Sequence, residues 1–132
     1  MTADTLSNVQ AEIRRKSDEF EEHFRNGRAR ELVRDYYVRD RPAMSAPDSP
    51  LLTDHESIAD LFAGLMESMS DCRLYQHDVR VSGERAYELG GAFIKSRDQS
   101  AGELECRYLI VWRNTEDGWR VETDFFAFGK LA

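Results

Sequence analysis

The sequence has few of the residues that build disulfide frameworks, metal centres or phosphate-binding loops. Its 132 residues include two cysteines, Cys72 and Cys106, which are too few for a disulfide framework, and neither belongs to a Cys-x-x-Cys pair. The three histidines lack the close spacing that metal ligands show, and no glycine-rich phosphate loop is present. We therefore expect neither a metal ion nor another cofactor.

An excess of basic charge and a long apolar run are also missing. The net charge is −7, and phosphate binding needs a basic face, so we expect no nucleic-acid partner. No apolar stretch approaches the ~20 residues of a membrane span, and the N-terminus lacks the basic region and apolar run of a signal peptide. These absences predict a cytoplasmic protein with free thiols and no membrane partner. The length suits a single domain over residues 1–132.

The first half of the chain predicts helices. A long helix is expected over about residues 4–26, and a short one over about 29–37. The long helix carries apolar residues at helical spacing, and they define its buried face: Val9, Ile13, Phe20 and Phe24.

A proline-containing loop separates these helices from a third. All three prolines lie within residues 41–52, which predicts irregular structure with a brief strand near 43–44. The third helix is expected to start at Thr53, where Thr53 and Glu56 form a capping box.

The second half of the chain predicts four strands in succession. Polar, glycine-containing turns separate the strands and favour an antiparallel meander. The expected strands cover residues 73–82, 85–95, 104–113 and 117–128. Gly90 and Gly91 fall in mid-strand and suggest a bulge or bend in a strongly curved sheet. Helices followed by such a sheet indicate an α+β fold with the helices on one face.

Four segments carry a resemblance to a known family. They are FRNG at 24–27, YVRD at 37–40, VRVSGERAYELG at 79–90 and VWRNTEDGWRV at 111–121. With their order and spacing, the chain from about Val9 to Phe128 resembles the SnoaL-like and ketosteroid isomerase-like members of the nuclear transport factor 2-like superfamily. The resemblance implies a cone-shaped curved antiparallel sheet wrapped around the long first helix, with two further helices and a pocket at the open end. It also implies a homodimer that pairs through the sheet, which apolar residues at Leu109 and Val111 favour.

The same resemblance argues against a steroid isomerase of the usual kind. In ketosteroid isomerase an aspartate base works with an oxyanion hole made by a tyrosine and a protonated aspartate. The position of the base falls on Ser45, that of the tyrosine on Phe20, and that of the second aspartate near Tyr108. Serine is too weak a base and phenylalanine donates no hydrogen bond, whereas tyrosine keeps the ability to donate to an oxyanion.

Other residues offer acid–base chemistry in their place. Asp124 alternates with Phe126 and Phe128, opposite Val121, Thr123 and Phe125, so an inward Asp124 would lie among aromatic rings and have a raised pKa. His77 alternates with Tyr75, Val79 and Val81, which makes a His77–Asp124 couple a hypothesis, with Tyr108 as a third group. The competing interpretations are a structural Asp124 and a half-buried His77 without a task.

Apolar residues of the helices and strands are candidates for the pocket wall, although simple core packing explains them equally well. They are Phe20, Phe24, Tyr37, Met44, Phe62, Met66, Phe93, Trp112, Phe126 and Phe128. Three functions remain open. The first is a domain that binds a small, largely apolar or carbonyl-containing molecule. The second is a cofactor-independent isomerase, cyclase or hydratase that uses Asp124 with His77 or Tyr108. The third is a dimeric interaction module with a filled cone.

Overall fold

The structure is a computed structural model that describes residues 3–131, with side chains from Thr5 onward. Its helices are α1 (Ala3–Arg25), α2 (Ala29–Tyr36) and α3 (His55–Ser68), and a 3-10 turn covers Gln99–Ala101. Its strands are β1 (Ala43–Ser45), β2 (Met69–Ser82), β3 (Arg85–Ser96), β4 (Glu103–Thr115) and β5 (Gly118–Phe128). This order confirms the predicted α+β fold. Among the described residues, no helix is long and apolar enough to cross a membrane.

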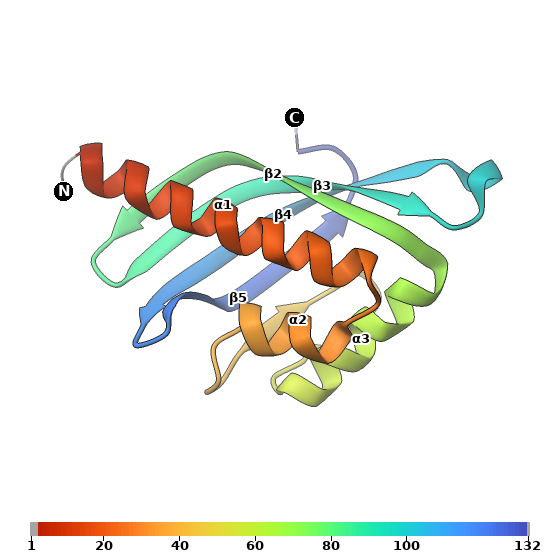
Figure 1. Cartoon of the computed structure of the whole chain (residues 1–132), viewed down its shortest axis with the longest axis horizontal. Helices are drawn as coiled ribbons and strands as arrows, with labels where there is room; N and C mark the ends of the chain where they lie inside the picture. The colour runs from red at the N-terminus through yellow and green to blue at the C-terminus, as the bar shows by residue number, and fades with distance from the viewer. Residues whose placement is uncertain (1–2, 132) are drawn as a thin grey trace.

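The sheet is a curved meander with one added strand. Strands β2 to β5 pair antiparallel in sequence order, and β1 joins the edge of β5 in parallel. The sheet is therefore mixed, and the brief strand expected near residues 43–44 is part of it. Helix α1 lies along the concave side of the sheet, and α2 and α3 pack together near the C-terminal end of α1 (Figure 1).

Helix α1 forms and ends as its sequence predicts. Its apolar stripe, including Val9, Ile13 and Phe24, is buried against the sheet and the other helices. The helix ends at Arg25, and Gly27 follows in a left-handed conformation, with a φ of 68° that few other residues adopt without cost. There the Arg28 N–H donates to the His23 carbonyl at 3.0 Å, which turns the chain toward α2.

The N-cap of α3 lies one residue later than expected, so the predicted capping box of Thr53 and Glu56 is wrong. Asp54 is the N-cap, and its carboxylate accepts a hydrogen bond from the Ser57 N–H at 2.7 Å. An aspartate at this position satisfies an unpaired backbone donor, and its negative charge interacts favourably with the positive end of the helix dipole. Strand β2 then follows directly at Met69, four residues earlier than predicted.

A bulge in β2 changes which side chains face the helices. Gln76 pairs with Gly90 and Asp78 pairs with Leu89, so His77 is the extra residue. The alternation predicted from Tyr75 to Val81 therefore breaks at His77. Val79 is buried on the concave side, whereas His77 is exposed.

A second bulge, at Glu122 of β5, corrects another expectation. Val111 pairs with Thr123, but Trp112 pairs with Val121, so Glu122 has no partner of its own. The bulge brings Val121 onto the same buried side as Asp124, not the opposite side as predicted. Both bulges add the local twist that a strongly curved sheet needs.

The centre of β3 has no room for a side chain at Gly90. A Cβ atom there would collide with the Tyr75 carbonyl oxygen and with the hydroxyl of Tyr108. We expect Gly90→Ala to lower the free energy of unfolding by about 1–3 kcal/mol, the usual cost of overpacking. Urea unfolding measures this loss.

The matched control is Gly64→Ala in α3, where a new Cβ meets no atom within 4 Å. This change should leave stability unchanged or raise it by up to about 1 kcal/mol, because alanine favours helix over glycine. Equal effects of the two substitutions would contradict the close packing at Gly90.

Candidate functional site

A small apolar cavity lies between the concave side of the sheet and the helices. Its free volume is about 50 Å³, compared with the roughly 10–15 Å³ that one ordered water needs. Ligands larger than a few heavy atoms therefore require the lining side chains to turn. The wall consists of Phe20, Phe24, Tyr36, Met44, Phe62, Leu65, Cys72, Leu74, Ala92, Ile94, Cys106, Tyr108, Ile110, Asp124 and Phe126.

Asp124 is the carboxyl group of this wall. It lies in the middle of β5, where Ile110 and Met44 are its strand neighbours, and only 6% of its surface is exposed. Burial raises the pKa of Asp124 to about 7; a hydrogen bond from Tyr37 lowers it, and the nearby charge of Glu88 raises it. The carboxyl group thus changes its protonation near neutral pH.

Tyr37 holds Asp124 from the end of α2. The Tyr37 hydroxyl donates to Asp124 Oδ2 at 2.8 Å, and no hydrogen bond to Oδ1 is found among the described residues. The tyrosine is fixed because its own N–H donates to the Val33 carbonyl and the next N–H, of Val38, donates to Val121. Burial, and then the charge of Asp124, raise the pKa of Tyr37 well above its ordinary value, so it keeps the proton that it donates.

Glu88 is a second buried carboxyl group, which the sequence analysis missed. It is fully buried on β3, where Oε1 accepts from Trp112 Nε1 and Oε2 accepts from the Tyr108 hydroxyl, both at 2.9 Å. Burial raises the pKa of Glu88, although both hydrogen bonds act in the opposite direction. Glu88 alternates with Ala86 and Ala92 on a face that is otherwise apolar. A carboxylate that alternates with small apolar residues along a strand is the sequence signal that would have identified Glu88 as buried.

Tyr108 lines the cavity, but its hydrogen is already engaged. Its hydroxyl lies 2.9 Å from Glu88 Oε2 and 3.2 Å from the Tyr75 carbonyl oxygen, and one proton serves one acceptor at a time. Toward a ligand the Tyr108 oxygen is therefore an acceptor. In this arrangement it is not the oxyanion donor that the resemblance suggested.

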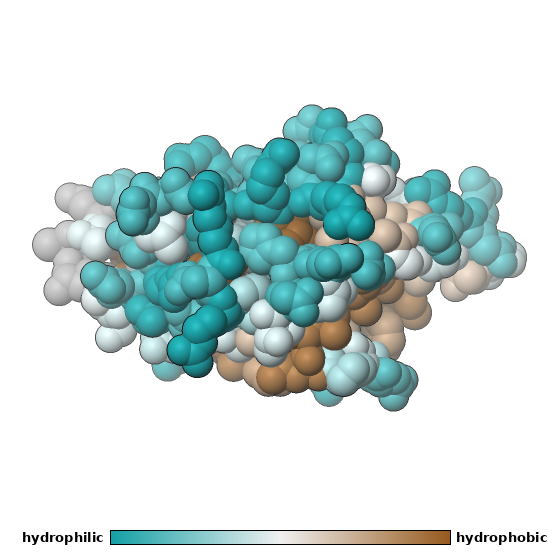
Figure 2. All heavy atoms as spheres, turned by 90° about the horizontal axis from the view of Figure 1, so that it is seen from below, coloured by the Kyte–Doolittle hydropathy of each residue, from teal (hydrophilic) through white to brown (hydrophobic). Residues whose placement is uncertain are grey.

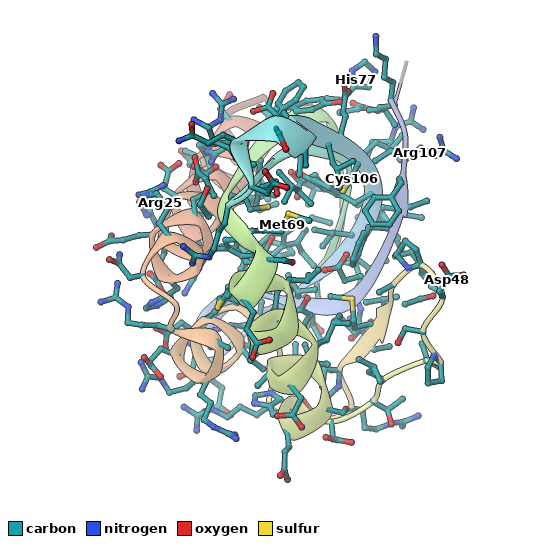
Figure 3. The ribbon with its side chains drawn as sticks, turned by 90° about the vertical axis from the view of Figure 1, so that its right-hand side faces the viewer. Arg25, Asp48, Met69, His77, Cys106 and Arg107 are labelled. Atoms are coloured by element: carbon teal, nitrogen blue, oxygen red, sulfur yellow. The ribbon has the colours of Figure 1, made fainter. Side chains whose placement is uncertain are left out.

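His77 lies away from the site. The bulge in β2 places it on the outside of the sheet, whereas Cys106 points into the interior between sheet and helices (Figure 3). The structure therefore does not form the His77–Asp124 couple that alternation alone predicted.

The predicted wall residues divide into three groups. Five of them line the cavity: Phe20, Phe24, Met44, Phe62 and Phe126. Tyr37, Met66 and Trp112 are buried but lie outside its wall. The last two were misplaced, because Phe93 packs beside Tyr75 on the convex face and Phe128 is 51% exposed at the end of β5. Ser45, at the position of the isomerase base, alternates with the buried Met44 and does not line the cavity.

One group of potential metal ligands occurs among the described residues, formed by Glu19, His23 and Asp35. His23 Nε2 lies 2.9 Å from Asp35 Oδ2, and Arg28 Nε donates to His23 Nδ1 at 3.2 Å. Arg34, and to a smaller degree His23, lower the pKa of Asp35 to about 2. The cations beside this group are Arg28 and Arg34, and its hydrogen bonds and ion pairs join α1 to α2.

The raised pKa of Asp124 predicts a pH-dependent stability. In the unfolded chain this group loses its proton near its ordinary pKa of 3.8, while the folded protein retains it up to about 7. The stabilisation is therefore complete at acidic pH and is lost as the pH rises toward about 7. Wild type should lose stability relative to Asp124→Asn by up to about 1.4 kcal/mol per pH unit in this window. Urea unfolding of both proteins at several pH values tests this, and parallel pH curves would contradict it.

Comparison with known protein families and with curated proteins finds no match to the chain. Solved structures do resemble it. A nuclear transport factor 2-like superfamily protein from Salmonella enterica has a TM-score of 0.76 and 17% identity, with 96% of each chain covered. A ketosteroid isomerase-like protein from Erwinia carotovora has a TM-score of 0.75 and 13% identity, with 98% of this chain and 99% of that one covered. A putative scytalone dehydratase from Novosphingobium aromaticivorans has a TM-score of 0.74 and 15% identity, with coverages of 98% and 89%. The TM-scores over nearly the whole chain establish the fold, and this chain is thus a protein of the nuclear transport factor 2-like fold.

Proposed function

We propose that the protein is a cofactor-independent acid–base enzyme, an isomerase or lyase, that acts on a small, largely apolar molecule next to a carbonyl group. The observation that carries this proposal is the position of Asp124, a buried carboxyl group on the wall of an apolar cavity, whose Oδ1 has no hydrogen bond from the residues that the structure describes. A carboxyl group in such surroundings is suited to exchange protons with a bound ligand.

The chemistry follows from the surroundings of Asp124. In its ionised form, Oδ1 takes a proton from the carbon beside the ligand carbonyl, while the Tyr37 hydroxyl stabilises the charge on Oδ2. The protonated carboxyl group then returns the proton to a different carbon or to a leaving hydroxyl group. The first outcome is an isomerisation and the second a dehydration.

Exposed apolar residues next to the cavity support the proposal of an apolar ligand. Leu104 pairs with Ile94, and Phe128 pairs with Cys106, so both continue the concave face beyond the cavity. Both are exposed, at 41% and 51%, and they offer an apolar path to Asp124. Two of the similar structures are named as ketosteroid isomerase-like and as a putative scytalone dehydratase, which agrees with this class of reaction.

Exchange of hydrogen for deuterium tests the proposal without knowledge of the natural substrate. We expect the protein to catalyse deuterium incorporation beside the carbonyl group of cyclohexanone or 2-cyclohexenone in D₂O, followed by proton NMR. The rate should rise with pH as Asp124 loses its proton, around pH 7. Asp124→Asn should reduce it by about 100-fold or more, the usual contribution of a general base.

Asp117→Asn is the matched control, because this carboxylate pairs with Arg39 at the surface and does not line the cavity. Its exchange rate should equal that of wild type. A ketone that raises the melting temperature without any exchange would contradict catalysis and leave a ligand-binding domain. Exchange that survives in Asp124→Asn would exclude Asp124 as the base.

We also propose that a second copy of the chain covers the convex face of the sheet. Tyr87, Leu89, Leu109 and Phe125 are 39–49% exposed there and are neighbours on three adjacent strands. Figure 2 shows an apolar area at one margin of a face that is otherwise mostly hydrophilic.

The charges around this apolar group favour a copy of the same face as its partner. Arg85 and Arg113 both pair with Glu122, Arg113 also pairs with Asp40, and Arg73 pairs with Glu103. Because these charges neutralise one another within the chain, the surface that covers them needs to be apolar rather than charged. A two-fold dimer provides such a surface from the same residues.

Leu109→Asp should therefore convert a dimer to a monomer, because it places a charge in the middle of the apolar group. Analytical ultracentrifugation measures the change. Leu51→Asp is the control, since Leu51 is 57% exposed but lies outside the sheet. A wild-type protein that sediments as a monomer at high concentration would contradict the proposed dimer.

A further inference from the structure

Glu88 is a buried carboxyl group for which the proposed reaction has no direct use. It is fully buried, and its hydrogen-bond partners among the described side chains are the neutral donors Tyr108 and Trp112. The cation that acts on it is Arg14 of α1, which is itself bound to Asp18, Glu21 and the Leu74 carbonyl oxygen. A carboxyl group buried without a paired cation is costly, so its retention calls for a physical reason.

We propose that Glu88 is a positioning residue for Asp124: it fixes the Tyr108 hydroxyl in the cavity wall and stores a proton, so that one negative charge is shared between the two carboxyl groups. This inference rests on the proposed role of Asp124 as the acid–base group. It adds a residue that touches no ligand but decides how readily Asp124 gives up its proton.

The hydrogen bonds of Tyr108 allow Glu88 to hold or release a proton while all non-hydrogen atoms stay in place. When Glu88 is charged, the Tyr108 hydroxyl donates to Oε2 across 2.9 Å. When Glu88 is protonated, it donates to the Tyr108 oxygen instead, and the Tyr108 proton turns to the Tyr75 carbonyl oxygen 3.2 Å away. Both states satisfy Glu88 and Tyr108, and Gly90 leaves the space in which they meet.

Electrostatics couples the two carboxyl groups. Ile110 of β4 pairs with Glu88 on one side and with Asp124 on the other, so both carboxyl groups lie on one buried face of neighbouring strands. Like charges repel strongly in such an apolar interior, and the charge of Glu88 raises the pKa of Asp124. Among the described residues, Arg14 is the charged group of opposite sign that acts on Glu88. The other titratable groups that face the pair keep their protons because burial raises their pKa: Tyr36, Tyr37, Cys72, Cys106 and Tyr108.

Carboxyl-carbon NMR tests the coupling directly. We would titrate protein labelled with ¹³C at aspartate Cγ and glutamate Cδ, and identify the Asp124 signal by its loss in Asp124→Asn. Glu88→Gln removes the charge while keeping an oxygen acceptor for Trp112 or Tyr108. The Asp124 midpoint should then fall by about half a pKa unit or more. An unchanged midpoint in Glu88→Gln would overturn the proposal.

Glu105→Gln is the matched control, because it removes one charge from the convex side of β4, where Glu105 accepts from Tyr75. It should leave the Asp124 midpoint unchanged; an equal fall in both variants would mean a general charge effect and would also overturn the proposal.

Should Glu88→Gln fail to fold, Asp124→Asn supplies the reciprocal measurement, because coupling between two sites is symmetric. The Glu88 midpoint should then fall in Asp124→Asn, and an unchanged value refutes the coupling.

Neither titration needs a substrate. A failure of deuterium exchange with intact coupling would therefore reject the proposed enzyme alone, whereas absent coupling with intact exchange would reject only the role of Glu88.

Discussion

The hydrogen bond from the Tyr37 hydroxyl to Asp124 joins the helical layer of this protein to the sheet at the wall of the apolar cavity. Tyr37 follows the last residue of α2, and Asp124 lies at the centre of β5. The bond is possible because Tyr37 is held by backbone contacts to both α2 and β5. The donor reduces, but does not remove, the cost of burying the carboxyl group, which therefore titrates near neutral pH.

Curvature of the sheet brings the rest of the site into place. Bulges at His77 and Glu122 and the glycine at position 90 bend the meander around α1. The bend leaves a narrow cavity between aromatic side chains of the helices and the middle of the strands. The bulges also decide which residues face it, since each one exchanges the two sides of its strand from that point onward.

The site combines an apolar wall with two carboxyl groups that have no salt bridge to any of the residues described by the structure. One of them, Asp124, meets the cavity, and the other, Glu88, lies behind the Tyr108 hydroxyl. Such an arrangement would suit the proposed proton exchange, because hydrogen bonds and charges act with little screening in an apolar region. The cavity itself is small, so side chains such as Phe62 and Phe126 must turn to admit a substrate of more than a few atoms.

The sequence by itself determined the order of helices and strands and the resemblance to the superfamily, and it predicted a carboxyl group at Asp124 among aromatic residues. These features follow from local periodicity, from turn residues and from a carboxylate placed among aromatic residues, all of which are visible in short segments. Only the tertiary structure decided that His77 lies outside, that Phe93 and Phe128 leave the wall and that Val121 faces inward. His77 and Val121 change sides because an extra residue interrupts their strands, and pairing with a neighbouring strand sets where that happens. Phe93 faces outward beside Tyr75, and Phe128 lies at the exposed end of β5. The partnership of Glu88 with Tyr108 and Trp112 was equally hidden, because residues 20 and 24 positions apart meet only when the neighbouring strands come into register.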